Sequence, residues 1–189
     1  MAELVQGSAI RLYSAEQLQA ILSRMARELY GVLQGVDPLA VVGIRRRGAP
    51  LADMLTKLLV DEHGFDNPLR LDITVKRYAD DLTVLFPYTR IEESQEFNCT
   101  DLSGHRILVV DDVVHGGYSL AKVADLLLQK APTDIHIACL VDRCTRVVPV
   151  HTDVVGIRLQ VATSDLIEVS VPPYETEFQI GLHQPRTAL

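Results

Sequence analysis

The stretch Ile107-Leu108-Val109-Val110-Asp111-Asp112-Val113-Val114-His115-Gly116-Gly117-Tyr118-Ser119 decides the expected fold. Its four leading apolar residues predict a buried strand, which runs into two adjacent carboxylates and then into a turn with two glycines. A helix is expected next, with Leu120, Val123, Ala124 and Leu127 on one side. A strand, a glycine-containing turn and a helix form a pattern in which backbone N–H groups and a helix N-terminus bind an anion.

Apolar patterns on both sides of this stretch predict further strands and helices. The helices are expected from Ser14, whose S-x-x-Q pattern is typical of a capping box, to about Gly35, and from Pro50 onward. Strands are expected over residues 39–44, 69–75, 134–141, 153–157 and, as the last one, 166–171. Alternating strands and helices predict an α/β fold with a twisted, mainly parallel sheet, in which ligands bind beyond the carboxyl ends of the strands. Residues 76–105 show no regular pattern, so we expect a structureless functional flap there.

The composition limits the class of protein. The 189 residues fit one domain, and 18 Lys and Arg against 25 Asp and Glu give a net charge of −7. A general affinity for polyanions is therefore not expected, and phosphate would have to be bound locally. The three cysteines show no C-x-x-C pair, which argues against a disulfide framework or a zinc ribbon. The sequence shows neither a signal-peptide pattern nor a membrane span, so we expect a soluble, cytoplasmic protein without a membrane partner.

Two loops at expected strand ends carry opposite charges. Arg45-Arg46-Arg47-Gly48 follows one strand, and the acidic pair with its glycine turn follows another. Amide groups of the glycine turn and the Ser119 hydroxyl suit a phosphate, while Asp111 and Asp112 suit a ribose diol or a magnesium ion. The loops therefore suit a phosphorylated sugar. The alternative is that Asp112 only caps a turn and that the arginines form a solvated charge run.

These residues resemble the phosphoribosyl-pyrophosphate (PRPP) signature of type I phosphoribosyltransferases. Within that family, the sequence is most similar to the bifunctional pyrimidine operon regulators with uracil phosphoribosyltransferase activity. Three other segments match in order: residues 42–48 with Leu51-Ala52; residues 71–74 followed by Arg77 and Asp80-Asp81-Leu82-Thr83; and residues 140–143 with Arg146, Pro149 and Val155-Gly156. The resemblance covers most of the chain.

The resemblance implies a role for each matching position. Asp111 and Asp112 would bind the ribose hydroxyls and, through water or ribose, Mg²⁺ that accompanies PRPP. Arg47, with Arg45, Arg46 and Gly48, would meet the pyrophosphate. The 5′-phosphate would be wrapped by Val114, His115, Gly116, Gly117, Tyr118 and Ser119.

The resemblance also implies two mobile or accessory regions. A flexible loop would span about residues 83–104 and act with Arg77, Asp80, Asp81 and Tyr88. A small hood would be formed by about residues 142–189 and the N-terminal segment, with Asp142 and Arg143 near the base. The implied assembly is a homodimer or a higher homo-oligomer.

The implied function is transfer of the phosphoribosyl group of PRPP to a nucleobase, with uracil favoured. Two departures from the family pattern keep alternatives open. Gly116 and Tyr118 stand where relatives carry a small hydroxyl residue and an arginine, so a weakly catalytic sensor of PRPP or a nucleotide is one alternative. Such a sensor could regulate RNA, although the sequence does not favour RNA binding. Cys144-Thr145 replaces Gly-His on the base side, so transfer to another base is the second alternative.

Overall fold

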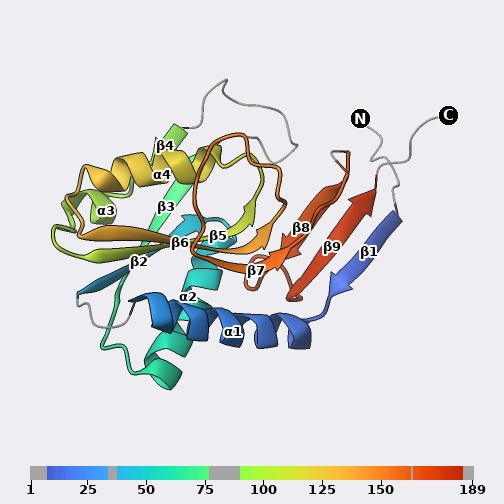
Figure 1. Cartoon of the computed structure of the whole chain (residues 1–189), viewed down its shortest axis with the longest axis horizontal. Coiled ribbons are helices and arrows are strands. Elements are labelled where there is room, and N and C mark those ends of the chain that lie inside the picture. The colour runs from blue at the N-terminus through green and yellow to red at the C-terminus, as the bar shows by residue number, and fades with distance from the viewer. Residues whose placement is uncertain (1–7, 34–37, 77–89, 163, 185–189) are drawn as a thin grey trace.

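The computed structural model describes residues 8–33, 38–76, 90–162 and 164–184 (Figure 1). Its elements are two sheets and four helices. In chain order they are β1 (Ser8–Tyr13), α1 (Ala15–Leu33), β2 (Leu39–Arg45), α2 (Gly48–His63), β3 (Leu69–Lys76), β4 (Arg90–Glu92), α3 (Gln95–Cys99), β5 (Arg106–Val114), α4 (Tyr118–Leu128), β6 (Asp134–Asp142), β7 (Val154–Arg158), β8 (Leu166–Ser170) and β9 (Gln179–Gln184).

The larger sheet has the strand order β4-β3-β2-β5-β6-β7. Strands β3, β2, β5, β6 and β7 are parallel, and β4 pairs antiparallel with β3. Parallel neighbours need crossover connections, and helices α2 and α4 supply two of them. The expected α/β fold with a mainly parallel sheet is confirmed.

Helices cover both faces of this sheet (Figure 1). On one face α1 and α2 pack against Leu108 and Val110 of β5, while on the other α3 and α4 pack against Ile107 and Val109. Side chains of a strand alternate between faces, so β5 contributes to two cores and must be apolar on both sides. None of the helices in the described ranges is long and apolar enough to cross a membrane.

The first helix begins as the capping pattern predicts. The Ser14 backbone N–H donates to Gln17 Oε1 at 2.9 Å, and the Gln17 N–H donates to Ser14 Oγ at 3.4 Å. These two bonds satisfy N–H groups that the first turn leaves unpaired. The apolar face of α1 is then buried against the sheet through Leu18, Leu22, Met25, Ala26, Leu29 and Leu33.

Strand β5 is longer than the sequence predicts, and this places the acidic pair. Pairing of β5 with β2 ends at Gly43↔Val110, but pairing with β6 continues to Val114↔Asp142. Asp111 and Asp112 therefore lie within the strand, not in a loop after it. Because β2 no longer pairs with β5 beyond Gly43, the edge of β5 beside these carboxylates is left for the arginine loop.

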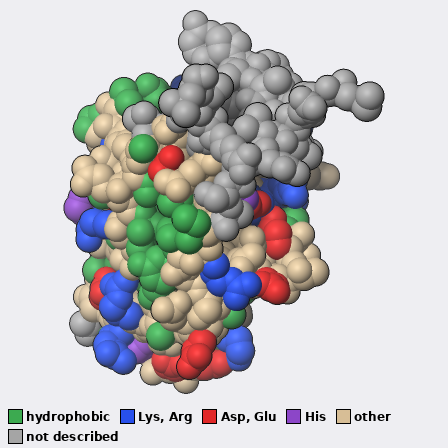
Figure 2. Space-filling view, turned by 90° about the vertical axis from the view of Figure 1, so that its right-hand side faces the viewer, with side chains coloured by type: hydrophobic (Ala, Val, Ile, Leu, Met, Phe, Trp, Pro, Cys, Tyr) green, Lys and Arg blue, Asp and Glu red, His purple; other side chains and the backbone are tan. Residues whose placement is uncertain are grey.

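A second, antiparallel sheet has the order β1-β9-β8. The prediction that residues 166–171 form the last strand is wrong, because β9 follows and pairs with both β1 and β8. The segments expected to form the hood include this sheet, but they also include β7, which belongs to the larger sheet. β1 is an edge strand on the side of the molecule that faces the viewer in Figure 2, where hydrophobic side chains form a central band. Its Ile10 side chain is exposed.

The expectation of a structureless stretch over residues 76–105 is corrected for residues 90–104. Strand β4 pairs with β3 there, and α3 is capped by Ser94, whose side chain accepts from the Phe97 N–H at 3.1 Å. Phe97 and Leu102 are fully buried. The charged residues around these two anchors obscured the pattern, because one or two buried side chains suffice for so short a helix. Residues 77–89 of the expected flap lie outside the described residues.

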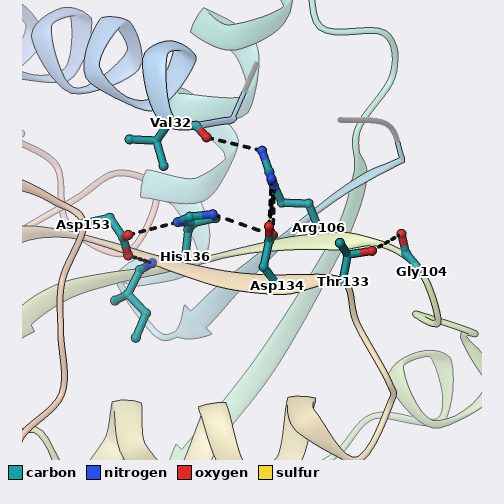
Figure 3. Close-up of polar contacts among 8 residues, drawn as sticks. Val32, Gly104, Arg106, Thr133, Asp134, His136 and Asp153 are labelled. Atoms are coloured by element: carbon teal, nitrogen blue, oxygen red, sulfur yellow. Dashed lines mark hydrogen bonds and ion pairs between the residues drawn. The ribbon is translucent and has the colours of Figure 1, made fainter. Parts of the chain in front are cut away.

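A polar network fixes the amino ends of β5 and β6, where the sheet begins (Figure 3). Arg106 binds both carboxylate oxygens of Asp134 through Nε and Nη2, with distances from 2.7 to 3.0 Å. His136 Nδ1 lies 2.9 Å from Asp153, whose other oxygen accepts from the Ile137 N–H. A bidentate guanidinium–carboxylate pair sets the register of two strands. The network lies at the end of β5 opposite the acidic pair.

Substituting Gly48 tests how closely α2 approaches β5. A Cβ at Gly48 would lie 2.7 Å from the Val110 carbonyl oxygen and 3.1 Å from Asp111 Cα. Both contacts are backbone, so we expect Gly48→Ala to lower the free energy of unfolding by about 1–3 kcal/mol, measured by urea denaturation. Gly31→Ala in α1 is the control, because a Cβ there meets nothing within 4 Å. Equal stability of Gly48→Ala and wild type would contradict the close approach.

Candidate functional site

The arginine loop lies against the acidic pair because α2 begins on top of β5. Gly48 is the first residue of α2, and its Cα has no room for a side chain beside Val110 and Asp111. Residues 45–47 therefore reach the carboxyl end of β5 directly from the end of β2. The peptide bond between Arg45 and Arg46 is cis.

Each of the three arginines has a partner in another element. Arg45 Nε donates to Asp72 Oδ2 of β3 at 3.1 Å. The Arg46 guanidinium lies 5.5 Å from the centre of the Tyr174 ring. Arg47 pairs with Glu175, with Nη2 at 2.6 Å from Oε1. Arg45 and Arg46 are exposed, but the run is anchored on one side by the large sheet and on the other by the segment that connects β8 and β9.

The acidic pair is held in an environment that resists ionisation. Asp111 is 8% exposed and Asp112 is partly exposed, and the Asp112 N–H donates to Asp111 Oδ1 at 3.0 Å. Burial, together with the Asp112 charge, raises the pKa of Asp111 well above its ordinary value. Burial also raises the pKa of Asp112, against the opposing effects of its hydrogen bonds and of the Arg47 charge. The two carboxylates are thus unequal, and Asp112 is the more accessible one.

The glycine turn meets the N-terminus of α4. Gly117 has φ +83°, a conformation that favours glycine, and it precedes Tyr118, the first residue of the helix. The Gly116 carbonyl accepts from the N–H groups of Val147 and Val148, at 3.1 and 3.0 Å. Within the described ranges, no backbone carbonyl accepts from the N–H groups of Gly116, Gly117 or Ser119. These amides and the helix N-terminus form a cradle that suits a phosphate.

The Tyr118 side chain lies over the glycine turn. A Cβ at Gly116 would be 2.9 Å from two atoms of the Tyr118 ring. Glycine at 116 and tyrosine at 118 therefore accommodate each other. Gly116 and Tyr118, the two residues of this turn that depart from the family pattern, are therefore in direct contact with each other.

Asp142 and Arg143, expected near the base, are buried and bonded within the protein. Asp142 accepts from the Cys144 N–H at 2.9 Å and pairs with Arg146. Arg143 Nη2 donates to the carbonyls of Ala162 and Asp165, at 3.2 and 3.0 Å. Their charged groups shape the loop after β6, and both lie at the same edge of the sheet as the acidic pair. Arg77, Asp80, Asp81 and Tyr88 lie outside the described residues.

Comparison with known proteins agrees with this geometry. The sequence model of the phosphoribosyl transferase domain family matches residues 10–176 of this chain. The chain belongs to the phosphoribosyltransferase family. It is 34% identical over 168 residues to the bifunctional protein PyrR of Deinococcus deserti, covering 88% of each chain. It is 37% identical over 179 residues to that of Acetivibrio thermocellus, covering 93% of this chain and 89% of the relative.

Solved structures share the phosphoribosyltransferase fold. A hypoxanthine phosphoribosyltransferase of Trypanosoma cruzi superposes with a TM-score of 0.74 at 20% identity, covering 95% of this chain and 93% of the other. A hypoxanthine-guanine phosphoribosyltransferase of Bacillus anthracis gives 0.70 at 17% identity, covering 95% of this chain and 99% of the other. These likenesses concern the fold.

The structure adds residues that the sequence reasoning missed. Glu175 and Tyr174 contact the arginine loop, and Glu168 of β8 lies 3.9 Å from Arg47. The proline pair Pro172-Pro173 marks a turn in the sequence. Nothing in the linear order indicates that this turn returns to residues 45–47.

The raised pKa of Asp111 predicts a pH dependence of stability. A buried carboxyl with a raised pKa binds more protons in the folded state than in the unfolded state. The free energy of unfolding therefore falls as the pH rises from the unfolded-state pKa through the folded-state pKa of this group. We expect Asp111→Asn to be more stable than wild type at pH 8 and to lose this advantage toward pH 4. Urea denaturation in EDTA across this range measures it.

The control for this experiment is Asp66→Asn, which changes an exposed carboxylate distant from Asp111 in the sequence. It should follow wild type at every pH. A wild-type free energy of unfolding that rises with pH relative to Asp111→Asn would contradict the assignment.

Proposed function

We propose that the chain transfers the phosphoribosyl group of PRPP to a nucleobase, with uracil as the favoured base, and releases pyrophosphate. The observation that carries the proposal is the juxtaposition of Arg47, the acidic pair of β5 and the glycine turn before α4 at one edge of the sheet. Cationic, acidic and amide groups are the chemistry that a diphosphate, a ribose diol and a phosphate need. Membership of the family and the PyrR relatives support it.

Each group of the site would act on one part of PRPP. The carboxylates of Asp111 and Asp112 would accept hydrogen bonds from the ribose hydroxyls. The amides of residues 116–119 would bind the 5′-phosphate, assisted by the N-terminus of α4. Arg47 would bind the pyrophosphate and stabilise the charge that develops as it leaves.

A magnesium ion fits the donors at this site. The carboxylate oxygens of Asp111 and Asp112 are the hard ligands that Mg²⁺ prefers, and Asp112 is accessible to solvent. They would hold the ion through water or through the ribose. When bound, Mg²⁺ would neutralise part of the negative charge of the pyrophosphate.

No protein nucleophile is needed for displacement at the anomeric carbon by a ring nitrogen of the base. The protein must position the two substrates and exclude water, which competes as a nucleophile. The base would lie beside the loop that Asp142 and Arg143 shape. A homo-oligomer stays a prediction. So does a flexible loop over residues 83–104, of which residues 83–89 lie outside the described residues and residues 90–104 contain β4 and α3.

A second candidate is a PRPP or nucleotide sensor with little catalysis. The Tyr118 ring over Gly116 favours it, because the turn presents an aromatic ring where relatives present a hydroxyl and an arginine. Losing one charge-assisted hydrogen bond to phosphate costs about 1.5–3 kcal/mol. A regulator of this kind could act on RNA, and transfer to a base other than uracil is the remaining alternative.

Pyrophosphate release with PRPP and Mg²⁺ tests the proposal across uracil, hypoxanthine, guanine, xanthine and orotate. We expect release with uracil, and a loss of kcat/KM of at least about 100-fold in Asp112→Asn, because the ribose loses its ionised acceptor. Asp125→Asn is the matched control, since this exposed carboxylate lies on α4 away from the turn. Release of pyrophosphate with a different base, and not with uracil, would identify that base as the substrate. Calorimetric binding of PRPP without release would favour the sensor.

A further inference from the structure

The segment after β8 forms a tight turn that presents one carboxylate. The Val171 carbonyl accepts from the N–H groups of Tyr174 and Glu175, at 3.1 and 3.2 Å, and the Val171 N–H donates to Glu175 Oε2 at 2.8 Å. Pro172 and Pro173 between them have fixed φ angles. Val171 is itself fully buried, so the turn is anchored in the core. Glu175 is therefore held in place independently of Arg47.

The second oxygen of the Glu175 carboxylate, Oε1, binds the edge of the Arg47 guanidinium that carries Nε and Nη2. Glu175 Oε1 accepts from Arg47 Nε at 3.1 Å and from Nη2 at 2.6 Å. The two side chains are only 31% and 23% exposed, so solvent screens their attraction less than it screens a surface pair. Burial raises the pKa of Glu175, but the hydrogen bonds with Arg47 and Val171 outweigh it and leave this pKa below its ordinary value.

A second carboxylate adds negative charge around the same arginine. Glu168 Oε1 lies 3.9 Å from Arg47 Nη2, and Glu168 Oε2 lies 2.6 Å from His183 Nε2. Glu168 is thus shared with a histidine, whereas Glu175 has Arg47 as its only ion-pair partner within the described ranges. Glu175 is the main counter-ion of Arg47.

We propose that Glu175 is a positioning residue that sets the affinity of this chain for diphosphate, by occupying Arg47 until the anion displaces it. The inference rests on the proposed function, in which Arg47 meets the pyrophosphate. The Nε and Nη2 edge of a guanidinium is a site for bidentate recognition of oxyanions, and one edge cannot bind two anions at once. The apparent affinity of a site that is competent only part of the time is reduced by that fraction.

The proposal predicts a gain of affinity on removing a contact. We expect Glu175→Gln to lower the Kd for inorganic pyrophosphate, titrated calorimetrically with Mg²⁺, by about three- to tenfold. The dependence of Kd on salt should become steeper, because one more positive charge is available to the anion. The KM for PRPP should fall while kcat does not rise, since tighter pyrophosphate leaves more slowly.

Two further variants make the result specific. Glu177→Gln is the matched control, since Glu177 lies two residues further on and forms a pair with Arg11 in which both side chains are about 60% exposed. It should leave the pyrophosphate Kd unchanged. Glu168→Gln keeps the contact between Glu175 and Val171 and should tighten pyrophosphate in the same direction but by less, because its distance to Arg47 is longer.

The outcomes separate this proposal from the proposed function. Suppose that wild type binds pyrophosphate, and that Glu175→Gln binds it equally or more weakly and melts at a lower temperature. Glu175 would then only close its turn, and this proposal would fail while the proposed function would stand. Binding by Glu175→Gln but not by wild type would support it strongly. If neither protein binds pyrophosphate or PRPP, both proposals fail.

Discussion

The site depends on the close contact between the start of α2 and the end of β5. Gly48 has no side chain, and its backbone lies so near Val110 and Asp111 that a Cβ would overlap the chain. This contact brings a loop of three cations to the edge of the strand that carries two carboxylates. Pairing of β5 with β2 ends at Val110 while pairing with β6 continues, and this difference opens the space in which the loop lies.

Charge balance then links the two sheets. The carboxylates of β5 are buried enough to resist ionisation, and the Arg47 charge opposes that resistance at Asp112. Arg47 in turn pairs with Glu175, on the segment that joins β8 to β9. In the proposed function, an anion that binds Arg47 therefore changes the charge that both Asp112 and Glu175 face. A substrate that carries a diphosphate and a ribose diol can address the two together.

The sequence predicted the parts of the fold whose signal is local. The capping residues of α1, the apolar run of β5 and the glycines before α4 each depend on neighbours within a few residues, and each was found in place. The extent of β5 beyond Val110 was missed, because it depends on pairing with β6. Strands β1 and β9 were missed because they pair with each other across almost the whole chain. Glu175 was missed for the same reason, since its partner lies 128 residues earlier.

The most direct measurement is a crystal structure of the chain with PRPP and Mg²⁺. The account predicts the ribose hydroxyls within hydrogen-bond distance of the Asp111 and Asp112 carboxylates, the 5′-phosphate on the amides of residues 116–119 and the diphosphate at Arg47. Density for PRPP away from the carboxyl end of β5, or a 5′-phosphate on the arginines with the glycine turn empty, would contradict it.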